Sequence, residues 1–267
     1  MNAFPLATRL GAASDRLHAR SRALVRHLNA DMQRIVLVWV VLASFGCGLR
    51  IAGATARGAD ALSGLMTALP YAFVIGAPII SLFLALRWFP AGGLLAQPKL
   101  RLARFGRWRD VDCVAARTLP LYGATGWMAS LLLGILINIP VRTLEFLTAI
   151  PALGAHAPQW FVGLYALTMA DVVVMTSLYA IAFVMALRHV PWFPRFLLMV
   201  WGFDLAAQLL IADLMAATPG LPASVARALG ALLEGNLQKT LISMSLWLPY
   251  LLLSRRVNLT YRSRVPG

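Results

Sequence analysis

Six stretches of mostly apolar residues, separated by polar links, dominate the hydropathy pattern of the chain. They cover residues 35–54, 65–86, 119–139, 160–187, 196–217 and 237–253. A helix that crosses a hydrocarbon core of about 30 Å needs roughly 20 apolar residues. The pattern therefore predicts an all-α, polytopic membrane bundle of six transmembrane helices.

The polar links divide the chain into three parts. Residues 1–33 carry arginines between leucines at helical spacing, which predicts a basic amphipathic helix lying flat on an anionic leaflet. A solvated positive tail that only orients the protein and an Arg- and Ser-rich transit peptide are the alternatives. Residues 34–118 hold a two-helix extension with a long basic loop, and residues 119–262 hold a four-helix membrane unit.

The basic residues show which side of the membrane each link occupies. With six crossings, 19 of the 24 Lys and Arg residues fall on the side that holds both termini. An excess of Lys and Arg marks cytoplasmic segments, so both termini are predicted to lie in the cytoplasm. The net charge of +14 could suggest nucleic acid, but the basic residues follow the links instead of gathering on one folded face. The predicted partners are the lipid bilayer, its anionic headgroups and other membrane proteins, with no nucleic acid.

Three carboxylates interrupt the apolar hairpin formed by residues 160–217. A carboxylate at membrane depth costs about 2.5–3.5 kcal/mol on insertion scales, so Asp171, Asp204 and Asp213 must find partners or water. Counted from the basic ends of their helices, Asp204 is expected near the midplane, and Asp171 and Asp213 near the outer boundary.

Three cations end their predicted helices at the same outer level, namely Arg50, Arg142 and Lys239. We expect Asp171 to form a structural polar lock with Arg142 or Arg50. Asp204 and Gln208 are one helical turn apart and are expected to mark the bundle interior or a water-filled cleft. The alternative is that all these polar residues are ordinary interhelical packing contacts.

No catalytic, cofactor-binding or metal-binding residues are predicted. The chain lacks the nucleotide-binding, hydrolase and metalloprotease motifs, and its two cysteines are far apart in sequence. None of the four histidines lies within a predicted membrane crossing or has a second histidine at metal-ligand spacing. The protein is therefore predicted not to be an enzyme.

Two segments resemble a known family. They read GWMASLLLGILINIPVRTLEFL from Gly126 and SLWLPYLLLSRRVNLTY over residues 245–261, and a WFP hinge lies between them. Over residues 120–262 the chain resembles the YdgK-like family of bacterial inner-membrane proteins of unknown function. The resemblance implies a bacterial inner membrane and carries no activity. In the terminal motif, Arg255 and Arg256 are expected to anchor the last helix at the inner headgroups.

Two functional hypotheses follow from this pattern. The first is a non-enzymatic accessory or scaffold protein that meets other membrane components at its basic inner face. The second is a small proton-linked secondary transporter that uses Asp204, and Asp171 with it, as its proton site. A wet cavity that reaches Asp204 would favour the transporter, and a fully packed surround would oppose it. A membrane enzyme ranks third.

Overall fold

Helices make up nearly all of the regular structure. The computed structural model describes residues 19–55, 61–99, 101–102, 106–154 and 157–267. In chain order the elements are a helix over residues 19–30, α2 (Met32–Thr55), α3 (Ala61–Trp88), β1 (Trp108–Asp110), α4 (Cys113–Thr118), α5 (Trp127–Ala149), α6 (Gln159–Leu187), α7 (Phe193–Ala216), α8 (Ala223–Leu253), α9 (Arg255–Arg262) and β2 (Arg264–Pro266). The predicted all-α architecture is confirmed for the described residues, with one two-stranded sheet added to it.

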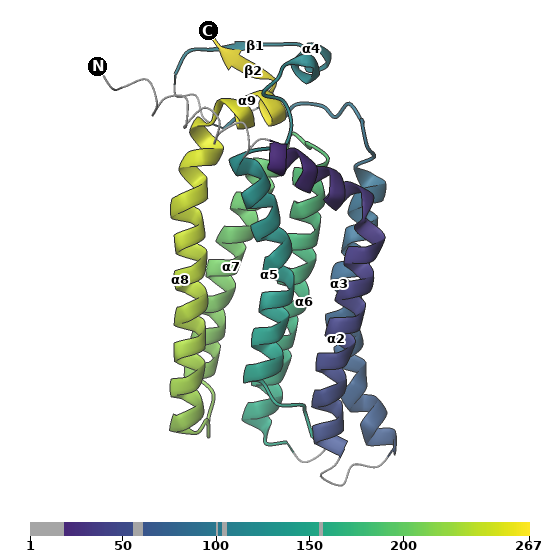
Figure 1. Cartoon of the computed structure of the whole chain (residues 1–267). Helices are drawn as coiled ribbons and strands as arrows, with labels where there is room; N and C mark the ends of the chain where they lie inside the picture. Colours follow the sequence, from purple (N-terminus) through teal and green to yellow (C-terminus); the bar gives the residue numbers. More distant parts are fainter. Residues whose placement is uncertain (1–18, 56–60, 100, 103–105, 155–156) are drawn as a thin grey trace, which may run out of the picture.

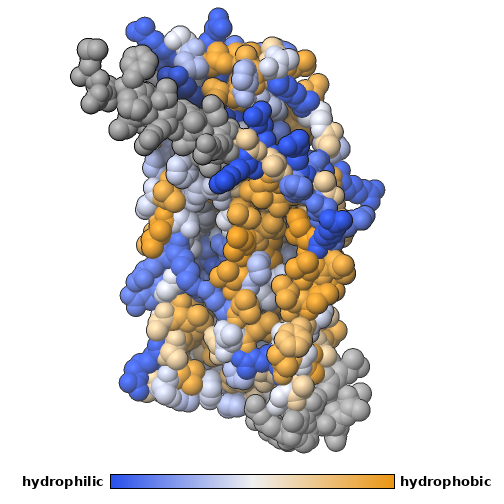
Figure 2. All heavy atoms as spheres, viewed as in Figure 1, coloured by the Kyte–Doolittle hydropathy of each residue, from blue (hydrophilic) through white to orange (hydrophobic). Residues whose placement is uncertain are grey.

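The long helices α2, α3 and α5 to α8 run side by side along one common direction (Figure 1). Helix α6 is at the centre, where it packs against α3, α5 and α7, and α8 packs against α7. Burial follows this arrangement: 61% of the most apolar part of α6 is buried inside the protein, compared with 11% for α2. The peripheral helices instead expose apolar side chains over much of their surface (Figure 2). That distribution suits a bundle surrounded by lipid.

Five of the helices in the described residues are long and apolar enough to cross a membrane. The candidate spans are Met32–Gly53, Thr67–Trp88, Trp127–Ala149, Gln159–Leu187 and Phe193–Ala216. The chain is therefore a multi-pass membrane protein. Helix α8 has 31 residues, and at about 1.5 Å per residue it is also long enough to cross. Polar residues in its middle, such as Asn236, Gln238 and Lys239, make it less apolar than the other five helices.

Helix α5 begins and ends later than the sequence suggested. The helix predicted over residues 119–139 runs from Trp127 to Ala149, and Pro140 lies inside it. Residues 119–126 instead form an irregular link with Gly123 and Gly126 at positive φ. A proline is tolerated within a membrane helix when neighbouring groups satisfy the backbone around it. Arg142 is consequently an interior residue of α5, and the prediction that it ends this helix is wrong.

Helix α8 likewise extends past its predicted start. The sequence predicts the last crossing over residues 237–253. The structure has one continuous helix from Ala223, so Asn236 and Lys239 lie well inside α8.

A folded cap covers one end of the bundle (Figure 1), and we call this end the capped end. It contains the residue 19–30 helix, α4, α9 and the antiparallel β1–β2 pair. Tyr261 of α9 is fully buried and donates to the Ala186 carbonyl at 2.8 Å. Arg256 donates to the Leu121 carbonyl at 3.0 Å. Arg256 therefore binds the protein's own backbone instead of pointing outward as expected for a headgroup anchor. Arg255 is exposed.

The N-terminal arm is helical over the residues that the structure describes. Residues 1–18 lie outside the description, and residues 19–30 form a helix that crosses the capped end (Figure 1). Leu28 is buried in the core, while Arg22 and Arg26 on the same helix are exposed. Ser21 Oγ accepts the Gly126 N–H at 2.9 Å, which fixes the helix to the start of α5. This part of the arm is amphipathic, as predicted.

The link between α6 and α7 should make the cap sensitive to acid. Burial, aided by Arg117 and Arg188, lowers the pKa of His189 from 6.5 to about 4. Its Nε2 accepts the Ala124 N–H at 3.3 Å, which requires an unprotonated nitrogen. Between pH 6.5 and about 4, this imidazole is protonated in the unfolded chain and neutral in the folded chain. The free energy of unfolding should therefore fall as the pH drops through this range, by up to about 3 kcal/mol.

Unfolding of the purified protein in detergent across this pH range measures the effect. The His189→Asn variant keeps a residue that tolerates the left-handed backbone at φ 56° and cannot titrate. Its stability should vary less with pH than that of the unchanged protein. Identical pH slopes for the two proteins would contradict this assignment.

Candidate functional site

A single guanidinium joins two carboxylates inside the bundle. Arg142 of α5 is 8% exposed, and its Nη1 donates to Asp171 Oδ2 of α6 at 2.9 Å. Its Nη2 donates to Asp204 Oδ1 of α7. The side chain of Asp204 is 1% exposed and that of Asp171 is 16% exposed. Charges removed from water need opposite charges and hydrogen bonds nearby, and this geometry supplies both.

Neutral groups complete the coordination of Asp204. The hydroxyl of Tyr179 on α6 donates to Asp204 Oδ2 at 3.3 Å, and Thr240 Oγ1 of α8 donates to the same oxygen at 2.9 Å. Gln208, one turn along α7, donates to Asp171 Oδ1 at 3.2 Å and accepts from Asn236 Nδ2 of α8 at 3.3 Å. Every helix from α5 to α8 contributes at least one group. We call this set the ion cluster: Arg142, Asp171, Tyr179, Asp204, Gln208, Asn236 and Thr240.

The ion cluster does not balance its own charge. It contains one guanidinium and two carboxyl groups, so in fully ionised form it carries one net negative charge. The nearby pair of Lys239 and Glu145 is neutral as a unit and adds nothing to this balance. Hydrogen bonds from Tyr179, Thr240 and Gln208 lower the cost of that excess charge, since donors to an ionised carboxylate favour the charged form.

The structure brings together four of the residues singled out in the sequence. The Arg142–Asp171 ion pair is present, and Asp204 and Gln208 belong to the same cluster instead of a separate one. Asp171 and Asp204 were predicted at different depths, but one guanidinium joins them, so they lie in one layer of the bundle.

The other three residues lie elsewhere. Arg50 donates to the backbone carbonyl of Thr148 at 2.7 Å and to that of Leu147, so it caps the end of α5 and makes no ion pair with Asp171. Lys239 pairs with Glu145. Asp213 is exposed on the opposite side of α7 from the ion cluster.

Sequence reasoning missed Tyr179, Asn236 and Thr240. One signal could have found the two α8 residues, because Asn236, Lys239, Thr240 and Ser243 recur at helical spacing and form a polar stripe. The predicted start of the last helix at residue 237 left Asn236 outside that helix, so the stripe was not recognised. Tyr179 carried no signal, since a lone tyrosine in an apolar run is indistinguishable from core packing.

A polar cavity lies beside the ion cluster. It has a volume of about 180 Å³ and is lined mainly by α5 and α8, with Tyr179 and Asp204 at its base. Lys239 and Glu145 form the ion pair that spans it from α8 to α5. Figure 2 shows blue residues half-way along α8, where the neighbouring surface is orange. A smaller cavity of about 40 Å³ borders Asp171 and Gln208 on the other side.

The arrangement suits binding and helix association better than covalent chemistry. The ion cluster contains no Ser, Cys or His paired with a base. Among the described residues, no group of three or more His, Cys, Asp or Glu side chains is placed to hold a metal ion. Cys47 and Cys113 are both free thiols.

No family model, curated protein or solved structure matches the chain. The resemblance to the YdgK-like family therefore stays a prediction from the two sequence segments described above.

The ion cluster should respond to mutation as one coupled unit. Arg142→Gln leaves two buried carboxyl groups without their cation and should lower the free energy of unfolding by about 3–5 kcal/mol. Asp171→Asn should cost less, because Asp204 still faces the guanidinium. Since the two residues share one network, the double variant should lose less stability than the sum of the single losses, by about 0.5–3 kcal/mol.

Equilibrium unfolding in mixed detergent measures all three variants. Asp213→Asn is the matched control, because Asp213 is exposed outside the ion cluster and its substitution should change the free energy of unfolding by less than about 0.5 kcal/mol. Additive losses for Arg142→Gln and Asp171→Asn would show that the two residues act independently.

Proposed function

We propose that the chain is a bacterial inner-membrane protein that crosses the bilayer six times, with both termini in the cytoplasm. The role we infer is non-enzymatic, as an accessory or scaffold protein that meets other membrane components at its basic inner face. The observation that carries this proposal is the state of Asp204, which is 1% exposed and receives hydrogen bonds from three neighbouring helices. A carboxylate held in this way stabilises the bundle, which supports a structural role for Asp204.

The distribution of charge supports the proposed orientation. The capped end holds the residue 19–30 helix, the basic loop before α4, and α9. Two of the cations assigned to the outer side, Arg142 and Lys239, lie within helices. The outer links are thus left with even fewer basic residues than the sequence count implied, which strengthens the positive-inside argument.

The ion cluster also explains how α8 can be a sixth crossing despite its composition. Its polar stripe faces α5 and α7, where Asn236 and Thr240 hydrogen-bond to the ion cluster. Leu241 and Ile242, on the side away from Asn236 and Thr240, are exposed and apolar. A helix whose polar groups are paired within the protein and whose apolar residues face lipid is compatible with a bilayer.

Labelling of cysteine variants tests the topology. In a background with Cys47→Ser and Cys113→Ser, Ser224→Cys at the start of α8 should react with a membrane-impermeant maleimide in intact cells. Arg255→Cys, at the start of α9, should react only after lysis, because α8 separates the two sites by one crossing. Both positions are exposed, so access to the reagent depends only on the side of the membrane. Equal labelling of both variants in intact cells would rule out the sixth crossing.

Two observations favour a second candidate, a small proton-linked transporter. The first is the cavity of about 180 Å³ that reaches Asp204, and the second is the net negative charge of the ion cluster. A site that is one positive charge short can accept a proton or a cation. Polar groups from α5 and α8 would then contact a small polar solute in the cavity.

Charge movement in proteoliposomes separates the two candidates. Under the accessory role, pulses of amino acids, sugars and small organic cations at acidic and neutral pH should give no current that differs between the unchanged protein and Asp204→Asn. Asp213→Asn is the matched control, because it removes an exposed carboxylate from the same helix. A solute-dependent current that Asp213→Asn retains and Asp204→Asn loses would establish transport and refute the accessory role.

A further inference from the structure

A basic pocket lies at the capped end, where three segments distant in sequence converge. Its walls are Val25, Arg26 and Asn29 of the residue 19–30 helix, Ala91 and Gly92 after α3, and residues 187–189 at the end of α6. Its volume is about 220 Å³. A cavity of this size can hold a phosphate group with part of its ester substituent.

The charges around this pocket are all positive. Arg26 and Arg188 line it, and no Asp or Glu is among its lining residues. Arg117 lies at its edge, where it donates to the carbonyls of Gly92 at 2.9 Å and Gly93 at 2.7 Å. The lowered pKa of His189, about 4, keeps that imidazole neutral at neutral pH, so the positive field comes from the guanidinium groups. The pocket is suited to an anion.

One donor at the pocket is unsatisfied. Arg188 Nε is buried and has no hydrogen-bond acceptor among the described residues. A buried donor without an acceptor costs about 1–3 kcal/mol, so such groups are uncommon unless a ligand satisfies them. Guanidinium groups bind phosphate oxygens through paired N–H donors, which makes a phosphate the natural acceptor here.

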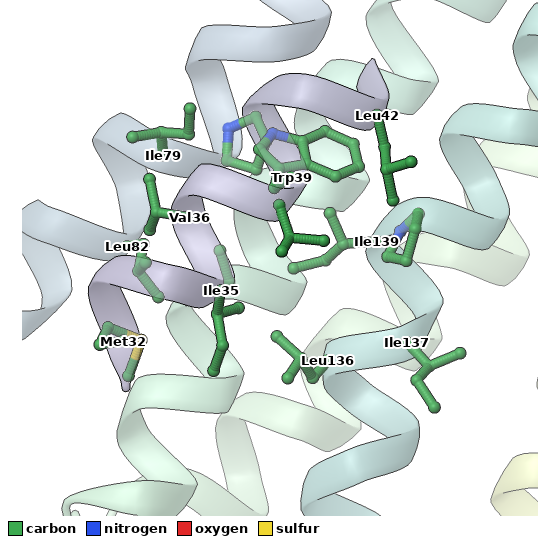
Figure 3. Close-up of a pocket in the computed structure, with 14 residues that line it drawn as sticks. Met32, Ile35, Val36, Trp39, Leu42, Ile79, Leu82, Leu136, Ile137 and Ile139 are labelled. Carbon is green, nitrogen blue, oxygen red and sulfur yellow. The ribbon is translucent and has the colours of Figure 1, made fainter. Parts of the chain in front are cut away.

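An apolar cavity lies deeper in the bundle, and helix α6 lines both it and the pocket. It has a volume of about 240 Å³ and opens between α2, α3 and α5, with Ala180 of α6 in its wall. Ile35 and Trp39 of α2 lie across it from Leu136 and Ile139 of α5 (Figure 3).

The helix geometry relates the two sites. Ala180 and Leu187, one in each lining, are seven residues apart and so lie on the same face of α6, about 10 Å apart along its axis. That separation matches the step from the phosphate layer to the upper hydrocarbon of a bilayer, whose polar regions are roughly 5–8 Å deep on each side.

We propose that the basic pocket binds the phosphate of an anionic phospholipid, and that an acyl chain of the same lipid occupies the apolar cavity. Basic pockets between membrane helices on the cytoplasmic side are suited to such headgroups. The proposal deepens the inferred contact with anionic headgroups by assigning it to one site. It rests on the proposed topology, in which the capped end faces the cytoplasmic leaflet. Binding in detergent does not depend on that topology, so a failed binding experiment would refute the lipid site without refuting the topology.

Native mass spectrometry of the full chain in a neutral detergent tests the site. The delipidated protein is titrated with phosphatidylglycerol, with phosphatidylcholine and with soluble glycerol 3-phosphate. We expect one phosphatidylglycerol to bind preferentially over phosphatidylcholine. Arg26→Gln combined with Arg188→Gln should weaken this binding roughly tenfold or more, since each basic residue near a lipid surface contributes about 1 kcal/mol.

The matched control is Arg107→Gln combined with Arg109→Gln, which removes the same charge from exposed positions outside the pocket. This control should bind phosphatidylglycerol as the unchanged protein does. Arg26→Glu alone, at an exposed position, provides a second variant if Arg188→Gln does not fold. It should also weaken binding.

Three results would overturn the proposal. They are equal loss of binding in the pocket and control variants, equal binding of the two phospholipids, and binding of glycerol 3-phosphate as strong as that of phosphatidylglycerol. The last result would assign the pocket to a soluble phosphorylated compound and leave the apolar cavity without a role in binding.

Discussion

The bundle depends on one arginine whose charge partners lie within the protein. Arg142 lies inside α5 and is 8% exposed, so its guanidinium needs carboxylates from neighbouring helices. Asp171 and Asp204 supply them from two different helices, and both contacts require α5, α6 and α7 to lie at one register. A shift of one helix along its axis by a single turn, about 5.4 Å, would break at least one ion pair. The ion cluster thus fixes helix register in a way that apolar packing alone does not.

Helix α8 is drawn into the bundle by the same requirement. Asp204 has two carboxylate oxygens, and Arg142 binds only one of them. The other oxygen takes the hydroxyls of Tyr179 and Thr240, and Thr240 can reach it only if α8 lies against α7. The contact satisfies both partners, because α8 would otherwise present Asn236 and Thr240 to lipid. Interhelical hydrogen bonds of this kind are individually modest, so it is their number in one layer that matters.

The sequence was sufficient for the parts of the structure that follow from hydropathy. The apolar runs predicted the five candidate spans, and the cost of a membrane carboxylate led to the pairing of Asp171 with Arg142. Errors arose where one residue could either end a helix or be tolerated within it. Pro140 was read as the end of a helix, which moved Arg142 to the membrane boundary. Whether a proline ends a helix depends on neighbours that a hydropathy pattern does not contain.

The cap illustrates a second limit of the pattern. The segment that forms α9 reads as a polar tail, yet Asn258 and Arg262 are buried within it. Arg262 donates to the Leu251 carbonyl at 2.9 Å and to Asn258 Oδ1 at 3.0 Å, so its burial comes from specific hydrogen bonds. Burial beside Arg264 and Arg195 lowers the pKa of Arg262 to about 10. No periodicity of apolar residues could have indicated this arrangement.

The use of arginine in the cap bears on the excess of positive charge. The chain has 24 basic and 10 acidic residues, so most of its cations cannot pair with carboxylates. Arg117, Arg256, Arg262 and, at the other end, Arg50 instead donate to backbone carbonyls at the ends of helices and in links. A helix leaves its last four carbonyls without partners inside the helix, and a guanidinium with five donors suits that role. Part of the positive charge is therefore structural, and exposed arginines that make no such contact, such as Arg255, remain for partners outside the protein.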